Sequence, residues 1–390
     1  MKKIIFLILV CTYSGVFYAQ TTVKEFMKKG DAIWNVNYKK RDSAIYYYTK
    51  ALEIDSNIYK AYIGRGDAIS GFRLGGWGEN KDHIYSRFEE DLNNAIEDYQ
   101  RAVKIKPNLG EAYCKIGEVY EMQGDSIKAL ENYIVAIKNG YYRAYIERGR
   151  FYQNHKKYED AINDFSKAIY YKENNRYSYS LRVNCKVALL DFEGAISDYD
   201  ELILLDPKNA YYFYNRAKYN NELQNYSEAI NDFDKAIEYS YKPVDYYYYE
   251  RGLCKFNNDD RIGAIQDFNK VIELNPEDGN AYYNRGRCKY FLDDDRGCIL
   301  DMTKAIPLQN GYAYSYFFRG LSRLRLEYLE GAIKDFSKAI KYNGNDAGFY
   351  YYRGFAKYSN GLKEAACIDW SNAGEMGKAE AYEAIKEYCK

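Results

Sequence analysis

A small residue that recurs about every 34 residues constrains the fold of this 390-residue chain more than any other feature. Glycine holds this small position in most copies, and valine or alanine holds it in the others. Seven successive copies lie 34, 34, 35, 34, 34 and 34 residues apart: Gly149, Val183, Ala217, Gly252, Gly286, Gly320 and Gly354. Such a period indicates a supersecondary unit that is stacked many times, because one unit cannot bury its apolar face alone.

Each copy continues with a second small residue and a large apolar residue at fixed distances. The second small residue comes twelve residues after the small position, and the large residue four residues later: Ala161 and Phe165, Ala195 and Tyr199, Ala229 and Phe233, Ala264 and Phe268, Cys298 and Met302, Ala332 and Phe336, Ala366 and Trp370. Polar, turn-prone stretches such as Gln224–Ser227 separate the two small residues. We therefore predict a hairpin of two closely approaching helices in each unit, with the aromatic rings filling the groove against the next unit.

These positions resemble the pattern W-x2-L-G-x2-Y…A-x3-F…P of the tetratricopeptide repeat family. The resemblance extends over about residues 24–373 and gives ten units, with an insertion near residues 70–90 in the second unit. It implies an all-α, right-handed α-solenoid of about ten helical hairpins over residues 20–375, whose first helices line a concave face. Residues 376–390 are expected to form the capping helix that such arrays require. The insertion contains Trp77 in a glycine-rich stretch, either a partner-binding loop or a tolerated insertion.

An arginine and an aspartate change together across the units. Where an arginine directly precedes the small position, an aspartate follows it by 16 residues, or by 33 across the insertion. The eight pairs are Arg65 with Asp98, Arg148 with Asp164, Arg182 with Asp198, Arg216 with Asp232, Arg251 with Asp267, Arg285 with Asp301, Arg319 with Asp335 and Arg353 with Asp369. The two remaining units lack both residues and have Ile116 with Asn132 and Lys29 with Tyr47. We therefore predict a structural, bidentate ion pair that joins the two helices of each hairpin and fixes their register.

An aromatic stripe marks the first helices of the last five units. It consists of the residues three before the small position, Tyr214, Tyr249, Tyr283, Phe317 and Tyr351, and is flanked one helical turn later by Lys218, Arg287, Leu321 and Phe355. By resemblance to the family, this stripe faces the concave groove. We predict an aromatic, mildly basic groove for an extended or helical peptide, since tyrosine offers a broad apolar face with a polar tip.

Other interpretations of the stripe and the array stay open. Either the rings pack only between neighbouring units, or the stacked tyrosines bind a carbohydrate or another small ligand. Helical hairpins of similar length also bind RNA. Because 56 lysines and arginines balance 56 aspartates and glutamates, however, no basic excess supports a nucleic-acid partner. A protein or peptide partner is therefore the main prediction.

No combination of residues predicts catalysis or a metal site. The chain has only two histidines, His83 and His155, and no CxxC motif or glycine-rich phosphate loop. Its eight cysteines have wide, irregular spacings that do not resemble a disulfide framework or a zinc site. Three of them occupy the same place in their units and are expected to replace buried alanines: Cys185, Cys254 and Cys288. We expect a binding protein without cofactor, metal or enzymatic activity.

The N-terminus, MKKIIFLILVCTYSGVFYAQ, resembles a signal peptide over residues 1–19. Lys2 and Lys3 precede the apolar run Ile4–Val10, which is too short to span a bilayer, and Ala19 ends a stretch suited to cleavage. The alternatives are a buried first helix, a retained anchor or a lipid anchor at Cys11. We predict export to a bacterial periplasm or cell envelope, or secretion, with no transmembrane span after the signal is removed.

Overall fold

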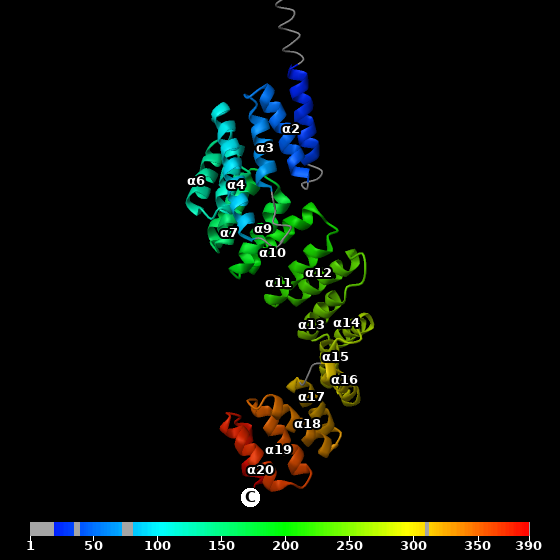
Figure 1. The fold of residues 1–390 in the computed structure, drawn as a ribbon. Coiled ribbons are helices and arrows are strands. Elements are labelled where there is room, and N and C mark those ends of the chain that lie inside the picture. The colour runs from blue at the N-terminus through cyan, green and yellow to red at the C-terminus, as the bar shows by residue number, and fades with distance from the viewer. Residues whose placement is uncertain (1–18, 35–39, 72–80, 309–311, 390) are drawn as a thin grey trace, which may run out of the picture. The chain divides into compact units, whose positions relative to one another are not determined.

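The computed structural model describes residues 19–34, 40–71, 81–308 and 312–389. The predicted signal segment up to residue 18 and the stretch of the insertion that contains Trp77 lie outside these residues. The chain divides into two compact units, Met1–Leu190 and Asp191–Lys390. Every regular element of the described residues is a helix, which confirms the all-α prediction (Figure 1).

The first unit begins with a helix over residues 19–34. The helices that follow are α2 (Arg41–Ile54), α3 (Tyr59–Ser70), α4 (Lys81–Ile105), α5 (Gly110–Met122), α6 (Ser126–Lys138), α7 (Ala144–Asn154), α8 (Tyr158–Tyr170) and α9 (Asn175–Ala188). Helices α3 and α4, α5 and α6, and α7 and α8 pack as hairpins, and each second helix also packs against the first helix of the following hairpin. The unit is therefore a row of stacked helix pairs.

The second unit repeats the same arrangement. Its helices are α10 (Phe192–Leu205), α11 (Ala210–Glu222), α12 (Tyr226–Tyr239), α13 (Asp245–Asn257), α14 (Arg261–Leu274), α15 (Gly279–Phe291), α16 (Asp295–Leu308), α17 (Ala313–Arg325), α18 (Leu329–Tyr342), α19 (Ala347–Ser359), α20 (Lys363–Glu375) and α21 (Glu380–Tyr388). The pairs from α11·α12 to α19·α20 are hairpins, and consecutive hairpins are in contact within the unit (Figure 1).

A left-handed residue follows the first helix of most hairpins. Where this residue is not glycine, its φ is 57–62°. The non-glycine residues at this place are Lys156, Leu190, Gln224, Asp259, Asp293 and Glu327. Gly124 and Gly361 take the same place, where the absence of a Cβ makes this conformation free of strain. An aspartate then begins several of the second helices, as Asp260 does by accepting a hydrogen bond from Gly263 N (2.8 Å). These two features set the hairpin turn.

The small positions allow the large ring of the second helix to lie directly on the first helix. A Cβ added at Gly149 would lie 2.6 Å from the Phe165 ring, and one at Gly320 would lie 2.8 Å from the Phe336 ring. On its other side, Phe165 packs with Cys185 of the next helix, α9. The large rings thus contact both their own hairpin and the next one. Three cysteines are buried in these cores: Cys185, Cys254 and Cys288.

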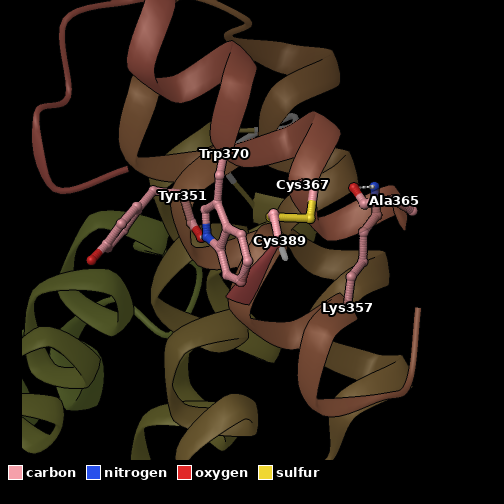
Figure 2. The surroundings of a disulfide bond; sticks show 6 residues. All are labelled: Tyr351, Lys357, Ala365, Cys367, Trp370 and Cys389. Carbon is pink, nitrogen blue, oxygen red and sulfur yellow. Dashed lines mark hydrogen bonds between the residues drawn. A yellow bond between two sulfur atoms is a disulfide. The ribbon is translucent and has the colours of Figure 1, made fainter. Parts of the chain in front are cut away.

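The C-terminal helix α21 is joined to α20 by a disulfide between Cys367 and Cys389. Figure 2 shows this bond beside Trp370, whose Nε1 donates a hydrogen bond to the Tyr351 carbonyl (3.1 Å). The inference that the cysteine spacing indicates no disulfide is therefore wrong for this pair. The wide, irregular spacing concealed the pair, because the other five described cysteines are free and buried.

None of the described helices is both long and apolar enough to cross a membrane. Within the same residues, no group of three or more histidine, cysteine, aspartate or glutamate side chains is placed to hold a metal ion.

Candidate interaction surface

Seven of the predicted arginine–aspartate pairs are brought together within their hairpins. In the hairpin of α15 and α16, Arg285 donates from Nε to Asp301 Oδ2 (2.9 Å) and from Nη2 to Oδ1 (2.6 Å). The same two-point contact joins Arg65 with Asp98, Arg148 with Asp164, Arg216 with Asp232, Arg251 with Asp267, Arg319 with Asp335 and Arg353 with Asp369. Arg182 and Asp198 belong to different compact units, so that pair stays a prediction.

The eight aspartates of these pairs lie in the core and not on the surface. Their exposed fractions are 3% for Asp98, 1% for Asp164, 1% for Asp198, 6% for Asp232, 3% for Asp267, 3% for Asp301, 3% for Asp335 and 1% for Asp369. Such burial is unusual for a carboxylate, which ordinarily stays in contact with water. No ligand can therefore reach these carboxylates, and they cannot count among the residues of a binding site. They belong to the framework that positions the surface.

A second cation accompanies some of the buried aspartates. Asp267 also accepts Lys255 Nζ (2.9 Å), and Asp335 also accepts Arg323 Nη1 (2.6 Å), each from one helical turn beyond the paired arginine. Lys289 and Lys357 make the same contact with Asp301 and Asp369. The second charge helps to offset the hydration that these carboxylates lose.

Other aspartates of the set have no cationic residue at that place. Ile69, Tyr152 and Asn220 occupy it in the hairpins of Asp98, Asp164 and Asp232. Burial raises the pKa of the Asp164 carboxyl despite the Arg148 guanidinium beside it. The charges around the ion pair therefore differ from hairpin to hairpin, although its geometry is repeated.

The same guanidinium groups also reach the preceding hairpin, a contact that the sequence pattern did not predict. Nη1 of Arg285 donates to Asn269 Oδ1 on α14 (2.6 Å). The corresponding contacts are Arg65 with Thr49, Arg182 with Ser166, Arg216 with Asp200, Arg251 with Asp234, Arg319 with Thr303 and Arg353 with Ser337. Every acceptor directly follows the large apolar residue of its hairpin. The arginine therefore ties neighbouring hairpins together as well as the helices of its own.

The aromatic stripe packs largely into the cores between hairpins. The rings of Tyr214, Tyr249 and Phe317 lie 5.8–5.9 Å from the large ring of their own second helix. Tyr283 is 9% exposed and contacts Phe318 of the next hairpin. Four flanking side chains lie beside the stripe, as the helical spacing predicts: Lys218 and Arg287 over rings, and Leu321 and Phe355 in apolar contact.

The C-terminal end of the stripe contacts the chain's own last residues. Lys378 Nζ lies 4.9 Å from the centre of the Tyr351 ring, and Tyr388 of α21 contacts Phe355. Part of the surface that the sequence pattern assigned to a ligand is therefore taken by the segment leading into α21 and by that helix. Figure 2 shows Tyr351 near Trp370 at this end of the chain.

A cavity of about 710 Å³ opens where two stripe residues meet in the second unit. Tyr249 and Leu253 of α13, Tyr283 and Asn284 of α15, and the turn residue Asp278 line it. The remaining lining residues are Glu277, Gly279, Asn280, Leu308 and Tyr312. Among the residues that the structure describes, neither lysine nor arginine lines this cavity, so the prediction of a mildly basic groove does not describe it.

A chain of hydrogen bonds holds the cavity wall in one arrangement. Asn284 Nδ2 donates to Tyr249 Oη (3.1 Å) and to the Asn280 carbonyl (3.0 Å), and its Oδ1 accepts from Arg287 Nη1 (3.3 Å). Arg287 lies over the Tyr283 ring, 5.5 Å from its centre. Burial, followed by the charge of Asp278, raises the pKa of Tyr249, so its hydroxyl stays protonated.

Family models agree with this geometry. Models described as TPR repeat and Tetratricopeptide repeat match residues 89–124, 142–175, 184–243, 246–278 and 313–346. The chain contains tetratricopeptide repeats. The match over residues 246–278 includes most of α13, the helix that carries Tyr249 and Leu253 of the cavity. Sequence comparison with curated proteins finds no match.

A solved tetratricopeptide repeat structure shares the fold. The C-terminal part of a TPR repeat-containing protein from Cytophaga hutchinsonii matches with a TM-score of 0.52 and 19% identity, covering 62% of this chain and 99% of that one. A tetratricopeptide repeat protein from Parabacteroides merdae gives a TM-score of 0.45 and 22% identity over 63% of this chain and 96% of that one. YrrB, described as a TPR protein with an unusual peptide-binding site, matches with a TM-score of 0.43 and 19% identity. The match covers 48% of this chain and 97% of that one.

Several cavity residues of these tetratricopeptide repeats were not predicted from the sequence. Glu277 and Asp278 belong to the turn between α14 and α15, to which the repeat pattern assigns no role. Asn284 follows Tyr283 in the chain, yet only the packing of α13 against α15 brings it to Tyr249. The periodicity could have indicated the turn residues, because the turn before a first helix lies at the same edge as the start of the stripe.

The cysteines of these repeats are unsuited to nucleophilic chemistry. Burial raises the pKa of Cys185 to about 11 and the pKa of Cys288 to about 12. The thiolate, which is the reactive form, is therefore scarce at neutral pH. Both side chains serve packing instead.

Proposed function

We propose that this tetratricopeptide repeat protein is a non-enzymatic scaffold that binds a peptide or protein segment along the aromatic stripe of its second unit. The observation that carries this proposal is the cavity at Tyr249 and Tyr283. Stacked helical repeats typically serve as interaction scaffolds, since they create extended binding surfaces. The cavity volume lies within the usual range for sites that receive a ligand group.

The packing of the stripe supports a role in binding. Rings that are already held by neighbouring rings lose little conformational entropy when a ligand arrives. Tyr249 receives a hydrogen bond from Asn284 and can donate its own proton to a backbone carbonyl of the ligand. Tyr312, which is 43% exposed, offers a further ring to the same cavity. A preformed wall with polar tips suits an extended segment.

A displayed library of random peptides tests this proposal. We expect wild-type protein to enrich a peptide family, and the Tyr249→Ala/Tyr283→Ala variant to lose that enrichment. Tyr241→Ala is the matched control, because Tyr241 is fully exposed and does not line the cavity. If the double variant loses helicity in far-UV circular dichroism, Tyr249→Phe replaces it, since phenylalanine keeps the ring and removes only the hydroxyl.

Two outcomes of the library experiment count against the peptide groove. Equal enrichment by wild type and cavity variants contradicts the proposal. Binding to a glycan array without any enriched peptide supports the carbohydrate alternative instead.

We also propose that the protein works in an oxidising compartment outside the bacterial cytoplasm. The signal-like N-terminus and the Cys367–Cys389 disulfide support this location, because disulfides persist mainly in secreted and periplasmic proteins. Cell fractionation followed by thiol labelling of the native protein is the test. A fully reduced protein in the cytoplasmic fraction contradicts the proposal.

A further inference from the structure

The cavity in the second unit is both acidic and aromatic. Glu277 is exposed and Asp278 is half-buried, and both carboxylates line the cavity together with the rings of Tyr249, Tyr283 and Tyr312. Leu253 and Leu308 add apolar walls. Two negative charges beside three tyrosines make a site whose charge selects its ligand.

No lysine or arginine of the described residues lines the cavity to neutralise this pair. The guanidinium that the wall engages, Arg287, is held by Asn284 and lies over the rings of Phe256 and Tyr283. Asp278 uses one oxygen, Oδ1, to accept the backbone N–H groups of Asn280 and Ala281 at 2.9 and 3.0 Å. Its negative charge therefore remains at the cavity edge while it caps α15.

The same turn in other hairpins of the second unit does not have two carboxylates. Lys208 and Asn209 stand before α11, and Asn345 and Asp346 stand before α19, at the places of Glu277 and Asp278. A turn that only had to begin a helix would need the capping residue alone. The two carboxylates are thus a property of this cavity and not of the repeat.

We propose that the segment bound in this cavity presents a cationic side chain, a lysine ammonium or an arginine guanidinium, to Glu277, Asp278 and the three tyrosines. The inference rests on the proposed function and names the ligand chemistry of that site. Carboxylates attract the charge, and tyrosine ring faces add a favourable electrostatic contact with a cation. Leu253 and Leu308 can pack on the methylene stem of such a side chain, which is apolar up to its charged end.

Small probes test the cation directly. The protein is labelled with 13C at its leucine methyl groups, so that Leu253 and Leu308 report binding. It is titrated with N-acetyl-lysinamide, with its neutral counterpart N-acetyl-norleucinamide and with the anionic N-acetyl-glutamate amide. We expect the lysine probe to bind about tenfold more tightly than the norleucine probe. Added salt should weaken only the lysine probe.

A charge-neutral variant provides the matched comparison. Glu277→Gln/Asp278→Asn keeps the side-chain shapes and the helix cap, since asparagine is also a good N-cap residue. We expect this variant to bind the lysine and norleucine probes equally. Asp259→Asn, which removes an exposed carboxylate in the turn after α13, should keep the preference. The inference is overturned if wild type binds the lysine and norleucine probes equally, or if it binds the anionic probe more tightly than the lysine probe.

The probe titration and the peptide library separate the two proposals. Enriched peptides without a lysine or arginine preference, combined with equal probe affinities, overturn the cation inference and leave peptide binding standing. A lysine preference in the probe titration without any enriched peptide supports the cation subsite and contradicts the peptide groove. Peptides whose lysine-to-norleucine change weakens binding to wild type, but not to the charge-neutral variant, support both.

Discussion

At the scale of single residues, the repeated arginine contacts its surroundings in three directions. Arg285 binds Asp301 in its own hairpin and Asn269 in the preceding one, and lies 5.4 Å from the centre of the Tyr282 ring. A buried carboxylate that loses such a partner loses most of what offsets its lost hydration. This explains why the two units without the arginine also lack the aspartate.

We expect the Arg285–Asp301 pair to be strongly coupled. Replacing Arg285 with Met should destabilise the protein by up to about 3–5 kcal/mol, because the buried Asp301 carboxylate loses its two-point partner and keeps only the single contact from Lys289. The double variant Arg285→Met/Asp301→Leu should be less destabilised than the sum of the single variants in urea unfolding. The exposed pair Lys235–Glu238 is the control and should show a coupling of about 0.5 kcal/mol or less. Additive losses at Arg285 and Asp301 would contradict the prediction.

The titration of Glu118 should make the stability of the protein depend on pH. Burial raises the pKa of its carboxyl above the ordinary 4.5; Lys115 partly offsets this, whereas the negative charges of Glu147 and Asp67 add to it. The folded state therefore holds the proton more tightly than the unfolded state, and stability is lost as pH rises through the raised pKa. Glu118→Gln should have a higher melting temperature than wild type at a pH above the raised pKa, and the same melting temperature below pH 4.5. A difference that does not change with pH would contradict the assignment.

At the scale of helices and hairpins, the last helix depends on a covalent link. Helix α21 has nine residues, too few for a stable isolated helix. The Cys367–Cys389 bond and the contact of Tyr388 with Trp370 hold it in place. Its apolar spacing predicts the helix but not the bond that fixes it.

We expect Cys389→Ser to loosen α21 and leave the rest of the second unit intact. The disulfide closes a segment whose ends are 22 residues apart, and such a loop is worth about 3 kcal/mol. Amide hydrogen exchange should therefore accelerate in residues 380–388 and remain unchanged in α13 to α16. The matched control is Cys288→Ala, which replaces a free buried cysteine. Unchanged exchange in α21 would show that packing alone holds the helix.

The repeated hairpins and the ion pairs within seven of them were predictable from the sequence. These features repeat, so the same spacing in several units supports the prediction for each one, as for Arg285 and Asp301. Features that occur once had no such support: the Cys367–Cys389 bond and the Glu277–Asp278 turn each depend on one packing arrangement.

Two properties of the ion pairs were not predictable from their spacing. The near-complete burial of the aspartates depends on how the helices pack in three dimensions, which a distance along the chain does not measure. The contact from Arg285 to Asn269 was missed for another reason, because the acceptors at this place vary among aspartate, asparagine, serine and threonine.

At the scale of the whole molecule, the two compact units consist of interchangeable parts. First helices are joined to the preceding hairpin through the same arginine geometry, as Arg319 and Arg353 illustrate with Thr303 and Ser337. Stability in such an array is the sum of the hairpins and the interfaces between neighbours. The length of the chain is therefore adjustable in steps of one repeat.

Deleting one complete period should leave a folded protein. Removal of residues 320–353 joins Arg319 to Gly354, so that Arg319 can pair with Asp369 as Arg353 does in the intact chain. We expect helicity per residue to stay unchanged in circular dichroism and the urea m-value to fall by roughly a tenth, in line with the shorter chain. Removal of residues 320–336 is the control, since half a period breaks the alternation of helices. Equal folding of both deletions would contradict the modular interpretation.

The five free thiols of the described residues are potential competitors of the native disulfide during folding. Cys114, Cys185, Cys254, Cys288 and Cys298 are all sealed inside hairpin cores, whereas the bonded pair lies at the end of the chain. An oxidant that reaches the nascent polypeptide before collapse meets several competing sulfurs, and mispaired crosslinks would trap it. Local helix pairing would bury these competitors, so we expect the native bond to form after the hairpins have folded.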